Sequence, residues 1–501
     1  MTTYDADGIT LERVREYVWE IPREGGMNAP ARVLASERLL DEISQDRTLQ
    51  QLRNAAHLPG VAKYALCMPD GHQGYGFPVG GVASIDAEGG CISPGAIGYD
   101  INCGVRMMKT NLDYDDVRGR EEELVESLFA NVPSGLGGGG VVETDVDTVE
   151  EILARGMDWA LEAGYAAEAD LAHCEDEGYR PEADPSKVSA KAKDRGKNQV
   201  GSLGSGNHFL EVQRVTDVFR EDVADAFGLR ENQIVVLIHC GSRGLGHQVC
   251  TDYLRDIEKA HAGLLDRLPD KELAAAPAGS QLAEDYYGAM CAAINFAWVN
   301  RQLIMHRTRR VFERLFDRSW EEMDMQLLYD VAHNIGKREV HEVPVDAEGR
   351  PTGVDEAVDH DKRELFVHRK GATRAFPAGR PELPPAYGDV GQPILIPGSM
   401  GAGSYVLRGG ENSIAETFGS TAHGAGRLMS RTQAKQEYWG EDVMDDLRDT
   451  HEVYVKAQSG ATVAEEAPGV YKNVDEVVRV SDALGIGDKV ARTFPVCNIK
   501  G

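Results

Sequence analysis

Five side chains of metal-binding type lie in separated, glycine-flanked segments of this 501-residue chain. They are Asp100 and Cys103 in GAIGYDINCGVR, His208 in GSLGSGNHFLE, His239 in IVVLIHCGSRG and His333 in YDVAHNIGKRE. One thiolate, one carboxylate and three imidazoles suit Mn, Fe, Co or Zn better than Mg or Ca, which prefer oxygen ligands. A neighbouring glycine lets the backbone approach a ligand closely. The pattern therefore predicts an enzyme whose metal site is assembled from loops.

The spacing of these residues, from position 100 to position 333, differs from the compact CxxC or HxxxH patterns of structural zinc modules. Cys103 could bridge two metal ions through its sulfur, with Asp100 beside one of them. Any one of the histidines alone would be interpreted as an ordinary buried residue. Taken together, and each beside Asn or Cys in a loop-like context, the three favour a metal site.

A further segment, TAHGAGRLMSR, offers His423 as a nucleophile. The chain has no GxxxxGK[ST] loop, no strand–GxGxxG–helix unit and no KxDG-like lysine, so common nucleotide sites are not supported. Imidazole can attack phosphorus when a neighbour fixes its tautomer. The small residues that flank His423 give a phosphorus centre access to its ring, and Arg427 is expected one helical turn later, where it could contact a phosphate. The glycine-rich segment PGSMGAGS could bind an anion through its backbone N–H groups. A structural histidine and a plain hairpin are the alternatives.

Ten segments, in order along essentially the whole chain, resemble the RtcB family of GTP-dependent RNA-splicing ligases. They are MPDGHQGYGFPVGGV, GYDINCGVR, GSLGSGNHFLEV, HCGSRGLG, AHNIGKRE, HRKGATRAFPAG, PGSMGAGSYVL, TAHGAGR, EAPGVYKNV and the closing Lys500-Gly501. The departures lie between these segments, in an acidic stretch at 142–187 and an Asp/Glu/Pro/Gly-rich stretch at 343–358.

The resemblance implies two Mn²⁺ ions bridged by Cys103, one completed by Asp100 and His208 and the other by His239 and His333. It implies that His423 attacks GTP and carries GMP. The implied GTP contacts are Asn207, His208, Phe209, Leu210, Glu211, His333, Asn334, Pro397, Gly398, Ser399, Met400, Ser404, His423, Gly424, Ala425, Gly426 and Lys500.

The implied reaction joins RNA 3′-phosphate or 2′,3′-cyclic phosphate ends to 5′-hydroxyl ends, in tRNA splicing and RNA repair. Cleaved RNA and an archease-type activator are the implied partners. The alternatives are a dinuclear metal-dependent phosphoesterase, which needs the five ligands but no nucleophilic His423, and a nucleic-acid-binding scaffold with a vestigial site. Incubation with labelled GTP and Mn²⁺ distinguishes these classes: a covalent label indicates a ligase, phosphate release alone a phosphoesterase, and neither a scaffold.

The net charge of −29 argues at first against an RNA partner, because an acidic protein repels a polyanion. Basic residues nevertheless cluster beside the predicted ligands, as in Lys191–Lys197, Arg243 and the group Arg369, Lys370 and Arg374. We interpret the charge as a salt-adapted surface with basic residues kept where phosphates bind. The predicted RNA contacts are Arg195, Arg243, Arg427 and Arg431.

The motifs are interleaved along the chain, which predicts a single catalytic domain over residues 1–501. Strands and helices without βαβ alternation predict an α+β fold, and the resemblance implies mixed sheets surrounded by helices with a central metal and nucleotide cleft. No apolar run is long enough to span a bilayer, the N-terminus lacks a signal-peptide layout, and eight cysteines lack paired spacing. These features predict a cytoplasmic protein.

Local patterns predict several elements. The spacing of Leu11, Val14, Val18 and Ile21 predicts a helix that ends at Pro22. IVVLIHC (234–240) predicts a buried strand that ends beside His239, and 286–318 predicts one or two helices. Further predictions are short strands at 393–398 and 404–409, a strand in NHFLEV with Asn207 and Glu211 on one face, and loops at 136–140 and 276–280.

Overall fold

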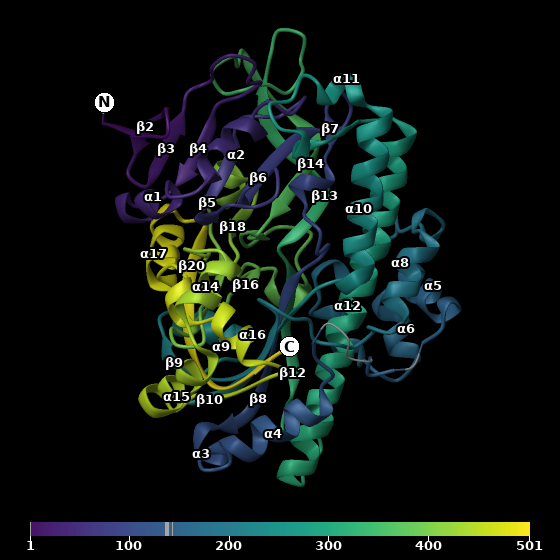
Figure 1. Cartoon of the computed structure of the whole chain (residues 1–501), viewed down its shortest axis with the longest axis vertical. Helices are drawn as coiled ribbons and strands as arrows, with labels where there is room; N and C mark the ends of the chain where they lie inside the picture. The colour runs from purple at the N-terminus through teal and green to yellow at the C-terminus, as the bar shows by residue number, and fades with distance from the viewer. Residues whose placement is uncertain (1, 136–139, 143) are drawn as a thin grey trace.

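The α+β class predicted from the sequence is confirmed in a computed structural model, which describes residues 2–135, 140–142 and 144–501. Two large sheets are flanked by helices, and the long helices α10 and α12 run along one side of the molecule (Figure 1). Both sheets combine antiparallel pairs with one parallel pair, β4 with β5 in the first sheet and β19 with β20 in the second.

The first sheet follows the order β1 (Thr3–Ala6), β2 (Ile9–Arg15), β3 (Val18–Ile21), β4 (Ala31–Leu34), β5 (Ala65–His72), β6 (Val79–Asp86), β14 (Asp359–Lys370) and β13 (Asn334–Val345). The second sheet follows the order β12 (Gln326–Ala332), β8 (Gly104–Asp113), β10 (Gln233–Cys240), β9 (Phe209–Val218), β20 (Gly487–Lys500), β17 (Ser404–Gly409) and β16 (Pro393–Ile396), with β19 (Tyr454–Ala457) beside β20. Two small pairs join β7 (Cys91–Ile92) to β11 (Ala276–Pro277) and β15 (Ala372–Arg374) to β18 (Ser420–Ala422).

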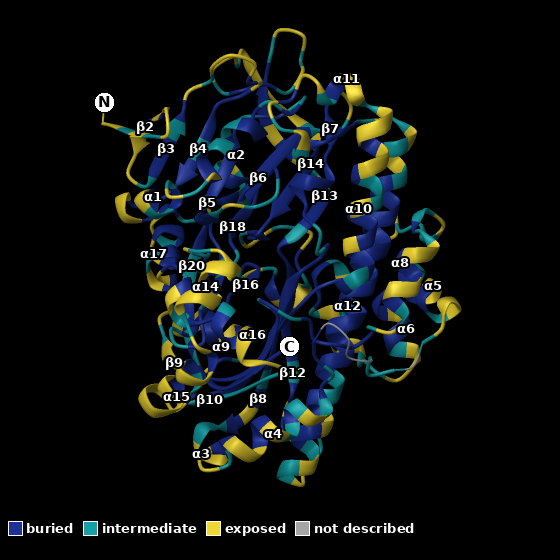
Figure 2. Ribbon diagram, in the orientation of Figure 1, coloured by how far each residue is buried: buried dark blue, intermediate teal, exposed yellow. Residues whose placement is uncertain are grey.

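The helices cover the outside of the sheets, and Figure 2 shows exposed residues on the outer faces of the helices and in the connecting loops, while the strands are largely buried. The α-helices are α1 (Glu37–Ile43), α2 (Thr48–Ala55), α3 (Tyr114–Val117), α4 (Glu121–Asn131), α5 (Val146–Arg155), α6 (Met157–Glu162), α7 (Glu168–Ala172), α8 (Ala190–Lys197), α9 (Glu221–Phe227), α10 (Arg243–Ala260), α11 (Ala262–Leu265), α12 (Gln281–Phe316), α13 (Ser413–Thr417), α14 (Arg431–Glu437), α15 (Gly440–His451), α16 (Gly460–Glu465) and α17 (Val474–Leu484).

The strand predicted at 234–240 is confirmed as β10, all of whose residues are buried. The stretch predicted as one or two helices is the single helix α12, which begins earlier than predicted because the Ser280 hydroxyl caps the backbone N–H of Ala283. The strands predicted at 393–398 and 404–409 are also confirmed, as β16 and β17.

The helix predicted from Leu11 to Ile21 is wrong, because this segment forms the hairpin β2–β3. Ile9 and Leu11 are buried on one face of β2, whereas Val14 is 48% exposed. Tyr17 takes a left-handed φ of 61° in the turn, which interrupts any helix. The apolar residues thus matched a helical spacing across two strands and the turn between them.

Two predicted loops have different outcomes. Within 276–280, Ala276 and Pro277 form the short strand β11, so that prediction is only partly correct. Most of the loop predicted at 136–140 lies outside the described residues. All eight cysteines are buried and free. No helix in the described part of the chain has the length and apolar character needed to cross a membrane.

Candidate active site

Neighbouring strands of the second sheet bring the predicted metal ligands to one edge. Gly104, the first residue of β8, pairs with Ala332 at the end of β12 and with Cys240 at the end of β10. Cys103, His239 and His333 are the sequence neighbours of these paired residues, so the three lie close together at the same end of the strands. The next strand, β9, starts at Phe209 opposite His239, which places His208 at the same edge. Antiparallel pairing therefore gathers ligands that are far apart in sequence.

The ligand atoms form two groups that share one sulfur. Cys103 Sγ lies 3.2 Å from His239 Nε2, which in turn lies 3.2 Å from His333 Nε2. On the other side, Cys103 Sγ lies 3.5 Å from His208 Nε2, and His208 Nε2 lies 2.8 Å from Asp100 Oδ2. Within each group all ligand atoms lie within 4.8 Å of one another. Cys103 belongs to both groups, as a bridging thiolate requires.

The chemistry of these side chains fits a pair of metal ions. Burial, together with neighbouring imidazoles, lowers the pKa of His239 and of His333, so both rings are neutral and offer a lone pair. Burial opposes ionisation of Asp100, but His208 and Arg243 hold its pKa below the ordinary value. The other carboxylate oxygen of Asp100, Oδ1, is buried without a hydrogen-bond partner. A cation at this position would satisfy it.

A buried arginine fixes the loop that carries Asp100 and Cys103. Arg301 Nη1 donates to the backbone oxygens of Asn102 at 2.7 Å and of Cys240 at 2.8 Å. Its guanidinium also pairs with Asp330 at 2.7 Å, and both side chains are fully buried. Asn102 holds a left-handed φ of 54°, which turns the chain between the two ligands. Arg301 thus ties the loop before β8 to β10 and β12 beneath the site.

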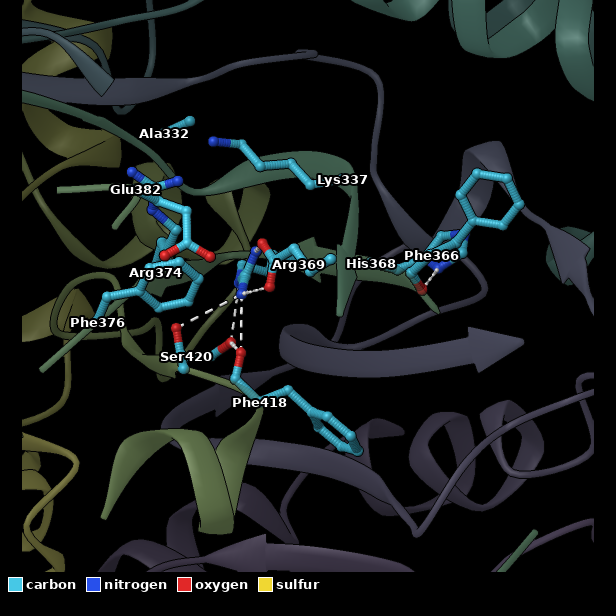
Figure 3. A network of polar contacts seen from close by, with 12 residues as sticks. Ala332, Lys337, Phe366, His368, Arg369, Arg374, Phe376, Glu382, Phe418 and Ser420 are labelled. Atoms are coloured by element: carbon cyan, nitrogen blue, oxygen red, sulfur yellow. Dashed lines mark hydrogen bonds and ion pairs between the residues drawn. The ribbon is translucent and has the colours of Figure 1, made fainter. Parts of the chain in front are cut away.

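A second buried network fixes the segment that carries His333. Glu175 accepts a hydrogen bond from the Ala332 backbone N–H at 2.8 Å and another from Lys337 Nζ at 2.5 Å. Arg374 Nε lies 3.3 Å from the same carboxylate. Figure 3 labels Ala332, Lys337 and Arg374 in this region, with Arg369 bonded to Ser420 and to Phe418 farther along. The network joins β12 and β13 on either side of the ligand.

His423 lies beside the predicted metal ligands, with its ring centroid 4.8 Å from that of His333. Asp70, at the end of β5, accepts hydrogen bonds from His423 Nδ1 at 2.6 Å and from the backbone N–H groups of His423 and Gly424 at 2.9 and 3.1 Å. Burial opposes ionisation of Asp70, but these contacts hold its pKa below the ordinary value. An ionised Asp70 keeps the proton on Nδ1 and leaves the Nε2 lone pair for attack.

A cavity of about 290 Å³ opens between the ends of the two sheets. Most residues predicted to bind GTP line it. Those that line it are Asn207, Phe209, Glu211, His333, Asn334, Pro397, Gly398, Ser399, Met400, His423, Gly424, Ala425, Gly426 and Lys500. Leu210 instead packs in the hydrophobic core on the opposite face of β9. The Ser404 hydroxyl accepts a hydrogen bond from the Gly398 N–H at 3.3 Å, so it supports the lining loop from behind.

The predicted strand in NHFLEV begins two residues later than Asn207, at Phe209. Asn207, Phe209 and Glu211 all face the cavity, which confirms that Asn207 and Glu211 share a face. His208 turns to the metal ligands. One short segment therefore serves both the cavity and the metal groups.

The inner wall of the cavity combines two carboxylates with a lysine. Burial raises the pKa of Glu211 to about 7, against the effect of nearby Lys500. Lys500 lies within β20, is only 4% exposed, and contacts Glu466 at 3.5 Å. Its Nζ also lies 5.1 Å from the Phe209 ring centroid. This wall can therefore offer carboxylate hydrogen-bond acceptors and an ammonium donor to a polar, ring-shaped ligand.

The arginines predicted to bind RNA lie in different places. Arg427 and Arg431 line the cavity, whereas Arg243 lies behind His208 and donates to Ser202 and to the Gly135 backbone. Arg195 is exposed on α8 and does not line the cavity. The expected helical turn between His423 and Arg427 is wrong, because a non-helical segment follows β18 and Arg427 pairs with Tyr471.

The sequence alone indicates no role for Asp70 or Glu466, and it shows Lys370 only as part of a basic cluster. Asp70 lies in MPDGHQGYG, where an acidic residue between Pro and Gly was the available signal. Lys370 lines the cavity and donates to the backbone oxygens of Tyr75 and Gly95, and burial lowers its pKa to about 8. Arg369 instead pairs with Glu339 at 2.6 Å in the buried network.

Fold and site together define an α+β protein with two candidate metal-binding groups joined through one cysteine, and with a histidine held beside them. The model of the family described as tRNA-splicing ligase RtcB matches residues 51–501. Curated proteins named tRNA-splicing ligase RtcB include one from Thermococcus kodakarensis, 53% identical over 98% of this chain and 99% of the relative. Those from Aeropyrum pernix and Archaeoglobus fulgidus are 49% and 48% identical, again over 98% of this chain and at least 99% of each relative. The chain belongs to the RtcB family.

Proposed function

We propose that this chain is an RNA ligase that joins 3′-phosphate or 2′,3′-cyclic phosphate ends to 5′-hydroxyl ends, with GTP as the energy source. The observation that carries the proposal is the Asp70–His423 pair beside two ligand groups that share Cys103. Residues 1–501 act as a single catalytic domain in this proposal. The RNA partner is a cleaved RNA such as tRNA exon halves, and an archease-type activator is a further proposed partner.

Two divalent ions, proposed to be Mn²⁺, would be held by the described ligands. Asp100 and His208 complete one site, His239 and His333 complete the other, and Cys103 belongs to both. When bound, such a pair neutralises phosphate charge and aligns attacking and leaving atoms.

His423 starts the reaction by attacking the α-phosphorus of GTP. The Nε2 lone pair forms the N–P bond while the bond to pyrophosphate breaks, and GMP stays on the ring. The proton on Nδ1 remains hydrogen-bonded to Asp70, whose negative charge offsets the positive charge that develops on the imidazole. The resulting adduct stores the energy needed for joining.

GMP then moves to the RNA. An oxygen of the RNA 3′-phosphate attacks the phosphorus of the adduct, the N–P bond breaks, and His423 returns to its neutral form. The 5′-hydroxyl of the second RNA end attacks the activated 3′-phosphate, loses its proton and expels GMP. A cyclic phosphate must first be opened by water.

The inner wall of the cavity suits guanine. An ionised Glu211 accepts hydrogen bonds from the N–H groups on one edge of guanine, and adenine lacks this pair of donors. Lys500 complements the carbonyl oxygen of the same base. We propose that these two residues select GTP over ATP.

The proposal is tested with two RNA strands, one ending in a 3′-phosphate and one beginning with a 5′-hydroxyl, incubated with protein, GTP and Mn²⁺. Joined product that needs GTP and is not formed with ATP supports the proposal. Release of phosphate without joining would instead identify a phosphoesterase, and the absence of both reactions would point to a scaffold. His423→Ala serves as the control, because it removes the nucleophile and leaves the proposed metal ligands in place.

A further inference from the structure

A short row of aromatic rings leads from the metal ligands to the protein surface. The Tyr99 and His247 rings are stacked, with centroids 4.7 Å apart and planes 27° from parallel. Tyr75 meets Tyr99 edge to face at 5.4 Å. Tyr99 lines the cavity and is the residue next to Asp100, whereas His247 is exposed on α10. The row therefore runs from the residue next to a proposed metal ligand to solvent.

We infer that Tyr99 and His247 form a stacking platform for the nucleobase of an RNA end whose terminal phosphate or hydroxyl lies at the metal ligands. This inference rests on the proposed function, since it assigns a role in holding the RNA substrate. Aromatic and histidine rings commonly stack on unpaired RNA bases. Because every base has an aromatic face, stacking tolerates different sequences. A platform of this kind suits a ligase that receives ends of differing sequence.

The backbone around the platform is held in place by its surroundings. His247 projects from α10 between buried positions, since Gly246 and Gln248 on either side of it are buried. Tyr75 is anchored because Lys370 Nζ donates to its backbone oxygen at 2.6 Å. Rings fixed in advance lose little conformational freedom when a base stacks on them.

Positive charge flanks the platform although the chain as a whole is acidic. Arg195 is exposed on α8, and its Nη1 donates to Gln248, the neighbour of His247, at 3.1 Å. Burial and the nearby Arg195 both lower the pKa of His247, so the ring is neutral and stacks as an uncharged aromatic. The guanidinium can contact the phosphate next to the stacked base. This arrangement combines a base contact with a phosphate contact, as in other single-strand binders.

The test measures equilibrium binding of short RNA strands to the metal-loaded protein by fluorescence anisotropy, without GTP. Each strand is made with a normal or an abasic nucleotide at the end to be joined, and the 3′-phosphate and 5′-hydroxyl strands are tested separately. The wild type should bind at least one normal strand about 5- to 100-fold more tightly than its abasic form. His247→Ala should bind the normal strand as weakly as the wild type binds the abasic strand. The affinity of His247→Ala for the abasic strand should be close to its affinity for the normal strand.

Two controls make the result specific. Phe219→Ala removes another exposed ring that stacks on a tyrosine, at 6.2 Å from Tyr405, and should leave RNA binding unchanged. Tyr99→Phe keeps the ring and should retain the abasic effect. Thermal unfolding and metal content of each variant show whether the fold and the neighbouring Asp100 are intact.

The strand that shows the abasic effect identifies which RNA end occupies the platform. If His247→Ala keeps the full wild-type sensitivity to the abasic nucleotide, or if neither strand is sensitive in the wild type, the inference is wrong. This outcome differs from failure of the proposed function, which would show as absence of GTP-dependent joining by the wild type. The binding measurement does not depend on that reaction.

Discussion

At the scale of single residues, the hydrogen bond from His423 Nδ1 to Asp70 decides which ring nitrogen can act. Asp70→Asn keeps the shape but removes the charge, and its amide can hold the ring in the other tautomer. We expect formation of the GMP adduct to slow by on the order of 10²–10⁴-fold. Single-turnover assays with labelled GTP measure this rate. An unchanged rate, with metal content equal to the wild type, would contradict the assigned tautomer.

The sulfur shared by the two ligand groups gives a second prediction. Cys103→Ser replaces a soft thiolate with a hard hydroxyl, so we expect loss of at least one Mn²⁺ per chain and of most joining activity. Cys250→Ser is the matched control, because this cysteine is also buried but packs in the hydrophobic core, where its sulfur donates to the Pro94 backbone oxygen. Metal analysis after dialysis provides the comparison. Two bound ions in Cys103→Ser would rule out the bridging role.

Glu211 should make guanine binding depend on pH. Burial raises its pKa to about 7, so the carboxyl is mostly protonated below that pH and mostly ionised above it. Only the ionised form accepts hydrogen bonds through both oxygens. Affinity for guanosine, which carries no phosphate, should therefore rise about tenfold between about pH 6 and pH 8. Calorimetric titration would measure this rise. Glu211→Gln should bind weakly and with a flat pH profile, and a pH-dependent variant would refute the assignment.

At the scale of secondary-structure elements, the junction of β12 and β13 positions His333 through Glu175. Glu175→Gln should weaken metal binding at the His239–His333 group by about 10- to 100-fold, as loss of supporting hydrogen bonds commonly does. Co²⁺ titration followed by its visible absorption reports on this site. Glu339→Gln is the control, because Glu339 pairs with Arg369 in the same region but does not contact Ala332. Equal losses in both variants would indicate general destabilisation instead.

The elements that the sequence predicted correctly are those with a strong local pattern. β10 contains the apolar, largely β-branched run 234–238, and α12 is long and free of proline, so each is recognisable without its neighbours. The Leu11–Ile21 hairpin was mistaken for a helix because four apolar residues have a helical spacing by coincidence. The turn at Tyr17 has no Gly, Asn or Pro at its left-handed position, so the sequence gives little sign of it.

At the scale of the whole molecule, residue type and glycine context were sufficient to select five side chains that the fold brings together into two groups able to hold metal ions. The sequence could not indicate that Asp70 contacts His423, because these residues lie 353 positions apart and meet only where β5 packs beside β18 in the folded chain. Nor could it separate Lys370, which faces the cavity, from Arg369, whose side chain enters the buried network. Alternation along β14 sends neighbouring side chains to opposite faces.

The central claim is that His423 carries GMP while the metal ligands stay separate from this role. It is tested most directly by incubating the protein with GTP labelled at the α-phosphate and Mn²⁺, denaturing it, and locating the labelled residue by mass spectrometry. The account predicts one GMP on His423 in the wild type. It predicts none in His423→Ala, although that variant still binds two metal ions. A label on another residue, or a labelled His423→Ala protein, would contradict the account.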